Sequence, residues 1–111
     1  MLVPPIANFL SIQKNNMFSI SLIFDFDDLI KVDERIIMDA VTKASNDNVA
    51  IALIDASTVV KAMIFKNMPR RRMRIIREEM IVKLRTYTPR SVWLAQRKIL
   101  EIVNKIILDG V

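Results

Sequence analysis

Three blocks of sequence decide the fold of this chain: IFDFDDLIKVDER at residues 23–35, AIALIDAS at 50–57 and FKNMPRRRMRIIREEM at 65–80. From Asp33 onwards, apolar residues recur at intervals of three and four, which is typical of helices with one face on a core. The chain has a single glycine in 111 residues, whereas hairpins and tight β turns commonly need glycine. We therefore predict an all-α fold, a compact bundle of about six helices.

Polar residues that cap helices, and prolines that begin them, divide the chain into elements. At 111 residues it has the size of one domain, which we assign to residues 23–111, with residues 1–22 as a separate N-terminal segment. The expected elements are a short helix at 6–13, a helix in the second half of 18–30, a helix capped by Asp33, a turn at 45–48 that supplies the next cap, a short central helix at 49–55, a helix capped by Ser57, a helix with Pro69 in its first turn, and a last helix from Thr88–Pro89 to about Leu108.

The composition excludes most catalytic and metal chemistry. The chain contains no cysteine and no histidine, so it lacks thiolates, disulfides, and the commonest general base and metal ligand. Its aspartate-rich segment is not a calcium loop, because the sixth position from Asp25 is Ile30 and the twelfth is Ile36, where glycine and glutamate are needed. We find no phosphate-binding loop or nucleophile motif. We conclude that the protein is not an enzyme, with no catalytic residue, cofactor, metal or small-molecule substrate.

The N-terminal sequence predicts a cytoplasmic protein. The most apolar early run, 17–26, is too short to cross a membrane and contains Asp25. The first residues also lack the basic region of a signal peptide.

Charge is divided unevenly along the chain. Residues 1–60 carry four basic and eight acidic side chains, whereas residues 61–105 carry thirteen basic and three acidic. Such a dipolar surface steers charged partners. The basic turn PRRRMR at 69–74 precedes Glu78 and Glu79 on one helix, a layout suited to contact with another charged protein. Nucleic-acid binding and an ordinary solvated surface are the alternatives; the two glutamates oppose the first, because they would repel a phosphate backbone.

Helical spacing separates the two faces of the helix that follows Pro69. A stripe of apolar residues predicts the inner face: Met73, Ile76, Met80 and Leu84. Four arginines fall outside the stripe: Arg70, Arg71, Arg74 and Arg77. The spacing of four predicts surface ion pairs between Arg74 and Glu78 and between Glu79 and Lys83.

Five blocks resemble one family in order and nearly in spacing: the C-terminal domain of the bacterial flagellar motor switch protein FliG. The family patterns are M-F-x-F-E-D, V-D-D-R, A-L-A-L, N-M-S-x-R and A-Q-x-K-I. The corresponding segments here are IFDFDD at 23–28, VDER at 32–35, AIAL at 50–53, NMPRR at 67–71 and AQRKI at 95–99. The resemblance covers residues 23–109. It implies a helical bundle preceded by a hinge at Ile23, Phe24, Asp25 and Phe26, and it makes residues 1–22 similar in position to the end of a preceding helical repeat.

The resemblance also implies a function. The family is a non-enzymatic rotor component of the flagellar motor, arranged as a ring on the cytoplasmic side of the inner membrane at the basal body. It implies contact with the stator protein MotA to generate torque, with the switch protein FliM to reverse rotation in chemotaxis, and with neighbouring FliG-like subunits. Nucleic acid is not among the implied partners.

Carried over by position, the resemblance assigns a torque face. The family arginine after N-M-S-x falls at Arg71, and the two family acids fall at Glu78 and Glu79. Arg71 and Glu78 are seven residues apart, two helical turns, so they share a face, and we include Arg74 with them.

Two departures from the family pattern keep an alternative open. Ile54 and Asp55 stand where the family has a lysine and a glycine, and residues 85–89 replace its G-P-V-R turn. Arg85 and Arg90 are the candidate substitutes for the lost arginine. If the lysine was discarded, Ile54→Lys should be tolerated. The alternative is a diverged or truncated relative that assembles with the rotor without generating torque.

Overall fold

The computed structural model describes residues 22–110, and every regular element in that range is helical. The elements are the 3₁₀ helix η1 (Phe26–Lys31) and the α-helices α1 (Glu34–Lys43), α2 (Asn46–Ile54), α3 (Thr58–Lys66), α4 (Arg70–Lys83) and α5 (Pro89–Asp109). The prediction of an all-α bundle of about six helices is confirmed. The predicted helix at 6–13 and residues 1–21 of the predicted N-terminal segment lie outside the described residues. Within the described range, no helix combines the length and apolarity needed to cross a membrane.

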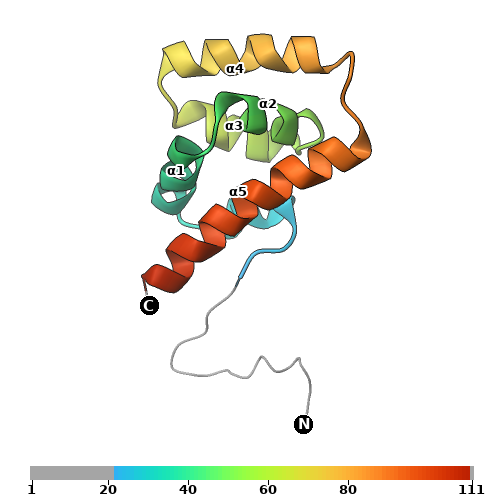
Figure 1. Ribbon diagram of the computed structural model, residues 1–111. Coiled ribbons are helices and arrows are strands. Elements are labelled where there is room, and N and C mark those ends of the chain that lie inside the picture. The colour runs from blue at the N-terminus through green and yellow to red at the C-terminus, as the bar shows by residue number, and fades with distance from the viewer. Residues whose placement is uncertain (1–21, 111) are drawn as a thin grey trace.

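Helix α2 is the centre of the bundle, as the sequence predicted. Four of its nine residues are buried: Val49, Ala50, Ala52 and Leu53. α4 packs on one side of it and α5 on the other, and α5 also packs on α1. Figure 1 shows this order, with α4 along one edge, α5 crossing the opposite side, and α2 and α3 between them. α2 is apolar around most of its circumference because both sides are covered.

Polar caps begin the helices where the sequence predicted. The carboxylate of Asp33 accepts the backbone N–H of Arg35 at 2.8 Å, and the Ser57 hydroxyl accepts that of Val60. At the start of α5, Thr88 and Ser91 form a reciprocal capping box. Each cap satisfies a backbone donor that the first helical turn leaves unpaired.

Two predicted helix starts are wrong by one to three residues. α2 begins at Asn46, not at residue 49, because the Ser45 hydroxyl already accepts the N–H of Asn48 and the following polar residues form the first turn. Pro69 lies at the cap position, one residue before α4, instead of in its first turn.

The predicted helix in the second half of 18–30 is a short 3₁₀ helix. The Asp25 carboxylate accepts the N–H of Asp27, which begins η1, and the N–H of Val32 bonds to the carbonyl of Leu29, which ends it. Phe26 and Leu29 are buried in the core. Three-residue spacing between these two anchors fits a 3₁₀ turn, which has three residues per turn.

Two amide side chains fix α5 against α2. The Nδ2 of Asn48 donates to the carbonyl of Ala95 at 3.0 Å, and the Nε2 of Gln96 donates to the carbonyl of Ala52 at 2.9 Å. Apolar packing alone tolerates small shifts between helices, whereas these directional bonds set the relative position of the two helices along their axes.

Truncating the central helix tests this arrangement. We expect Leu53→Ala to lower the free energy of unfolding by about 2–5 kcal/mol, because Leu53 is fully buried on α2 and its truncation leaves a cavity. Leu108→Ala, at a half-exposed position in the last turn of α5, is the control and should change it by less than about 1 kcal/mol. Urea unfolding followed by circular dichroism measures both; equal effects would contradict the central position of α2.

Candidate functional site

Helix α4 covers α2 with its apolar stripe and exposes the rest of its surface. Ile76 is fully buried, and Met73 and Met80 are half-buried against the core. Leu84, the fourth residue of the predicted stripe, is instead 56% exposed. It lies just past the end of α4, where the chain turns away from α2 towards α5.

Arg72 attaches the first half of α4 to the corner between α1 and α2. Its Nε donates to the Asn46 side chain at 2.7 Å, its Nη1 to the carbonyl of Val41 at 2.8 Å and its Nη2 to the carbonyl of Ala44 at 2.7 Å. These carbonyls belong to the C-terminal end of α1, where a cation is favourable. Burial lowers the pKa of the Arg72 guanidinium from its ordinary value. The sequence placed Arg72 in a basic turn without identifying this bracing contact.

Lys83 attaches the other end of α4. Its ammonium lies 2.8 Å from the Asp47 carboxylate, and this neighbour raises the pKa of Lys83, with Glu79 adding a smaller electrostatic contribution. The predicted Glu79–Lys83 pair is therefore wrong. Among residues 22–110, no ion pair joins Arg74 to Glu78 either. The lysine reaches the first turn of α2 because α4 lies directly over it.

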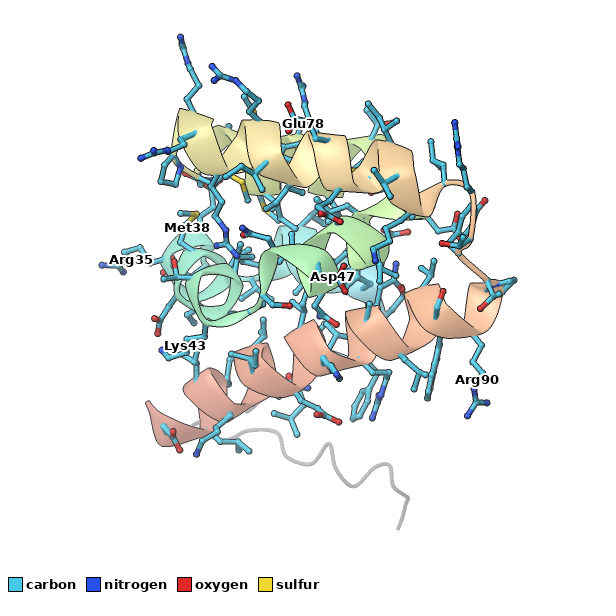
Figure 2. The ribbon with its side chains drawn as sticks, turned by 45° about the horizontal axis from the view of Figure 1, so that its top comes forward. Arg35, Met38, Lys43, Asp47, Glu78 and Arg90 are labelled. Carbon is cyan, nitrogen blue, oxygen red and sulfur yellow. The ribbon has the colours of Figure 1, made fainter. Side chains whose placement is uncertain are left out.

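Three predicted site residues form an outer ridge on α4: Arg71, Arg74 and Glu78. All three are exposed. At about 100° per residue, Arg71 and Glu78 differ by about 20° around the helix, and Arg74 lies about 40° from Glu78. Figure 2 shows Glu78 on the side of α4 that points away from the other helices. The ridge thus presents charges of both signs to solvent, free of the ion pairs that the spacing predicted.

Glu79 lies at the side of α4, away from the top of the ridge. It follows Glu78 by one residue, about 100° around the helix, and it is half-buried on the side where Lys83 meets Asp47. The two glutamates therefore face different surroundings, which their adjacency in sequence does not reveal.

Both candidate substitutes for the family arginine lie outside α4, the helix that carries the ridge. Arg85 lies in the exposed turn after α4, and Arg90 lies in the first turn of α5. Figure 2 shows Arg90 projecting from the start of α5, on the opposite side of the molecule from Glu78. Of the two, Arg85 is on the chain segment that directly continues α4.

The predicted hinge residues include two anchors and two exposed positions. Phe26 is buried, whereas Phe24 and Asp25 are exposed. The N–H of Ile23 donates to the Oδ1 of Asn104 at 2.8 Å, and the Nδ2 of Asn104 donates back to the carbonyl of Ile23 at 2.9 Å. A single amide on α5 thus holds both backbone groups of Ile23. The hinge stays a prediction.

Ile54, at the position of the family lysine, is half-buried at the end of α2. It lines an open groove with side chains of α3 and α4. A lysine there could extend its ammonium to solvent while its stem stays in the groove, so the expected tolerance of Ile54→Lys stays a prediction. Within residues 22–110, no group of three or more acidic side chains is arranged to hold a metal ion.

Fold and surface together define a class: a small all-helical domain that presents charges of both signs on one exposed helix. The family model described as the FliG C-terminal domain matches residues 19–111. The chain is 31% identical over 83 residues to the flagellar motor switch protein FliG of Thermotoga maritima, and 32% identical over 83 residues to that of Bacillus subtilis. Each match covers 75% of this chain and 24% of the relative.

This chain belongs to the FliG C-terminal domain family. It spans about a quarter of the length of these curated relatives.

Neighbouring arginines on α4 should differ sharply in their effect on stability. We expect Arg72→Met to lower the free energy of unfolding by about 2–3 kcal/mol, because it removes three hydrogen bonds from a charged donor while keeping much of the apolar stem. Arg71→Met is the matched control and should change it by less than about 0.5 kcal/mol, because Arg71 is exposed. Denaturant titration decides, and a larger effect at Arg71 would show that the bracing contact is misassigned.

Removing the Asn104 amide should release the start of the domain. In Asn104→Ala we expect the Ile23 amide to exchange with solvent at least about ten-fold faster, which corresponds to about 1.4 kcal/mol of local opening, because its acceptor is lost. Hydrogen exchange measured residue by residue by NMR provides the readout. The amides of α2 serve as the internal control and should change far less; a uniform change across the domain would point to global destabilisation.

Proposed function

We propose that this chain acts as a rotor component of the bacterial flagellar motor, in the switch complex on the cytoplasmic side of the inner membrane. The observation that carries the proposal is the family match over residues 19–111, together with identity of about 31% to proteins named as flagellar motor switch proteins. Neighbouring FliG-like subunits and the switch protein FliM are the proposed partners within the rotor.

We further propose that the outer ridge of α4 contacts the stator protein MotA. Arg71, Arg74 and Glu78 are all exposed, and Figure 2 shows Glu78 on the side of α4 away from the other helices, so a partner can reach the ridge without unfolding anything. Exposed ion pairs contribute only about 0–1 kcal/mol each, which suits a contact that forms and breaks at every step of rotation. Glu79 is half-buried beside Lys83, so it presents less of its carboxylate to a partner than Glu78 does. We therefore assign it a supporting part in this contact.

A second candidate function is assembly into the rotor without torque generation. The observation that favours it is Ile54, an apolar residue that lines the groove at the position of a family lysine and therefore supplies no charge there. Arg90, a candidate substitute for the other lost charge, the family arginine, projects on the opposite side of the molecule from Glu78.

A graft separates the two candidates. Residues 23–111 would replace the matching C-terminal region of the full-length FliG of Bacillus subtilis, in a strain without its own copy. Rotation of cells tethered by a filament would support torque generation. Filaments that assemble on cells that never rotate would support the second candidate. Stable protein without filaments would contradict both.

Reversing the sign of the ridge should stop rotation in a graft that turns. We expect Glu78→Lys to reduce rotation speed or the motile fraction strongly, because an attractive contact becomes repulsive, while filament number stays unchanged. Glu101→Lys, an exposed glutamate on α5, is the matched control. Normal rotation in the Glu78→Lys graft, at normal protein level, would refute the assignment of the ridge to the stator contact.

A further inference from the structure

An open groove of about 390 Å³ lies beside α4, on the side towards α3. Its volume is within the range of sites that bind small ligands or a few side chains of a partner. The apolar lining comes from three helices or their ends: Ile54, Phe65, Met80, Ile81 and Leu84. The groove exists because α4 packs chiefly on α2, which leaves its flank towards α3 uncovered.

Of the five apolar side chains that line the groove, two are exposed and three are half-buried. Ile81 is 66% exposed, and Leu84, three residues later at the C-terminal cap of α4, is 56% exposed. Phe65 on α3 is half-buried, with the Arg77 guanidinium 5.4 Å from the centre of its ring. Apolar side chains that gather in one concave surface are typical of an interaction site, whereas isolated ones are not.

The charged rim of the groove has one sign. Lys61 from α3 and Arg77 from α4 are the charged residues in its lining, and no carboxylate lines it. Neither cation forms an ion pair with a carboxylate within residues 22–110. Charge complementarity therefore requires an acidic occupant. Residues 1–21 contain no aspartate or glutamate, so charge does not favour them.

We propose that this groove binds an acidic amphipathic segment of a partner protein. The apolar side chains of that segment pack on Ile81 and Leu84, and its carboxylates meet Lys61 and Arg77. The groove adjoins the outer ridge along one flank of α4: Ile81 lies about 60° around the helix from Glu78, whereas Arg77 and Leu84 lie about 100° and 120° from it. The inference goes beyond the proposed function, since it assigns a second partner surface that does not depend on contact with a stator.

Two matched peptides test the proposal on the full chain. Each is a fluorescein-labelled peptide of about 14 residues, long enough to form a helix on contact, with leucines at i, i+3, i+4 and i+7. One carries glutamates at the flanking positions and its twin carries lysines. Fluorescence anisotropy should show the acidic peptide binding about ten-fold more tightly than the lysine twin, because two exposed ion pairs are gained and two repulsions are avoided.

Adjacent residues on α4 supply the control. Ile81→Glu should weaken binding of the acidic peptide about ten-fold or more, because it places a like charge in the groove. Val82→Glu should leave binding unchanged, since Val82 is 61% exposed but does not line the groove. Lys61→Glu combined with Arg77→Glu should reverse the preference towards the lysine twin. Circular dichroism would verify that each variant keeps its helical content.

Three results would overturn the proposal. The first is no binding of the acidic peptide, and the second is equal binding to the Ile81→Glu and Val82→Glu variants. The third is a concentration-dependent dimer, seen by analytical ultracentrifugation, that Ile81→Glu dissociates, because it would make a second copy of this chain the occupant. None of these results depends on rotation, so the outcome is independent of the graft experiment.

Discussion

Burial of the short helix α2 on both sides is the constraint on which the rest of the structure depends. A nine-residue helix is too short to be stable by itself in water, so its apolar side chains must be covered by α4 on one side and by α5 on the other. This requirement places α4 at the edge of the bundle with one face inward. The charged outer ridge is exposed for the same reason, since no further helix covers α4 on its outer side in the described part of the chain.

Local signals in the sequence predicted the helices, and pairings between distant residues escaped prediction. Asp33, Ser57 and Thr88 could be identified as caps because a cap acts on the next two or three residues. The contact of Arg72 with the carbonyl of Val41 joins residues 31 positions apart, and helical spacing carries no information about such a pair. For the same reason, helical spacing predicted an ion pair between Glu79 and Lys83. The position of α4 over α2 instead brings Lys83 into an ion pair with Asp47.

Two of the residues that carry the family resemblance join helices to one another. Asn67 donates its Nδ2 to Glu34 and to the carbonyl of Met63, both at 2.9 Å, which ties the end of α3 to the start of α1. Gln96 similarly ties α5 to α2. The Ile54 side chain makes no such polar tie, so a change there breaks no hydrogen bond between helices, and the tolerance of Ile54→Lys stays a prediction.

The two polar attachments of α4 have a mechanical consequence. Arg72 and Lys83 are three turns apart on α4, yet they bond to Asn46 and Asp47, which are neighbours in the first turn of α2. A force on the outer surface of α4 is therefore passed to α2 through the apolar contacts between the two helices and also through two side-chain attachments that meet on one turn of α2. Because Arg72 and Lys83 hold α4 near both of its ends, we expect α4 to move together with α2 when a partner pulls on its outer surface.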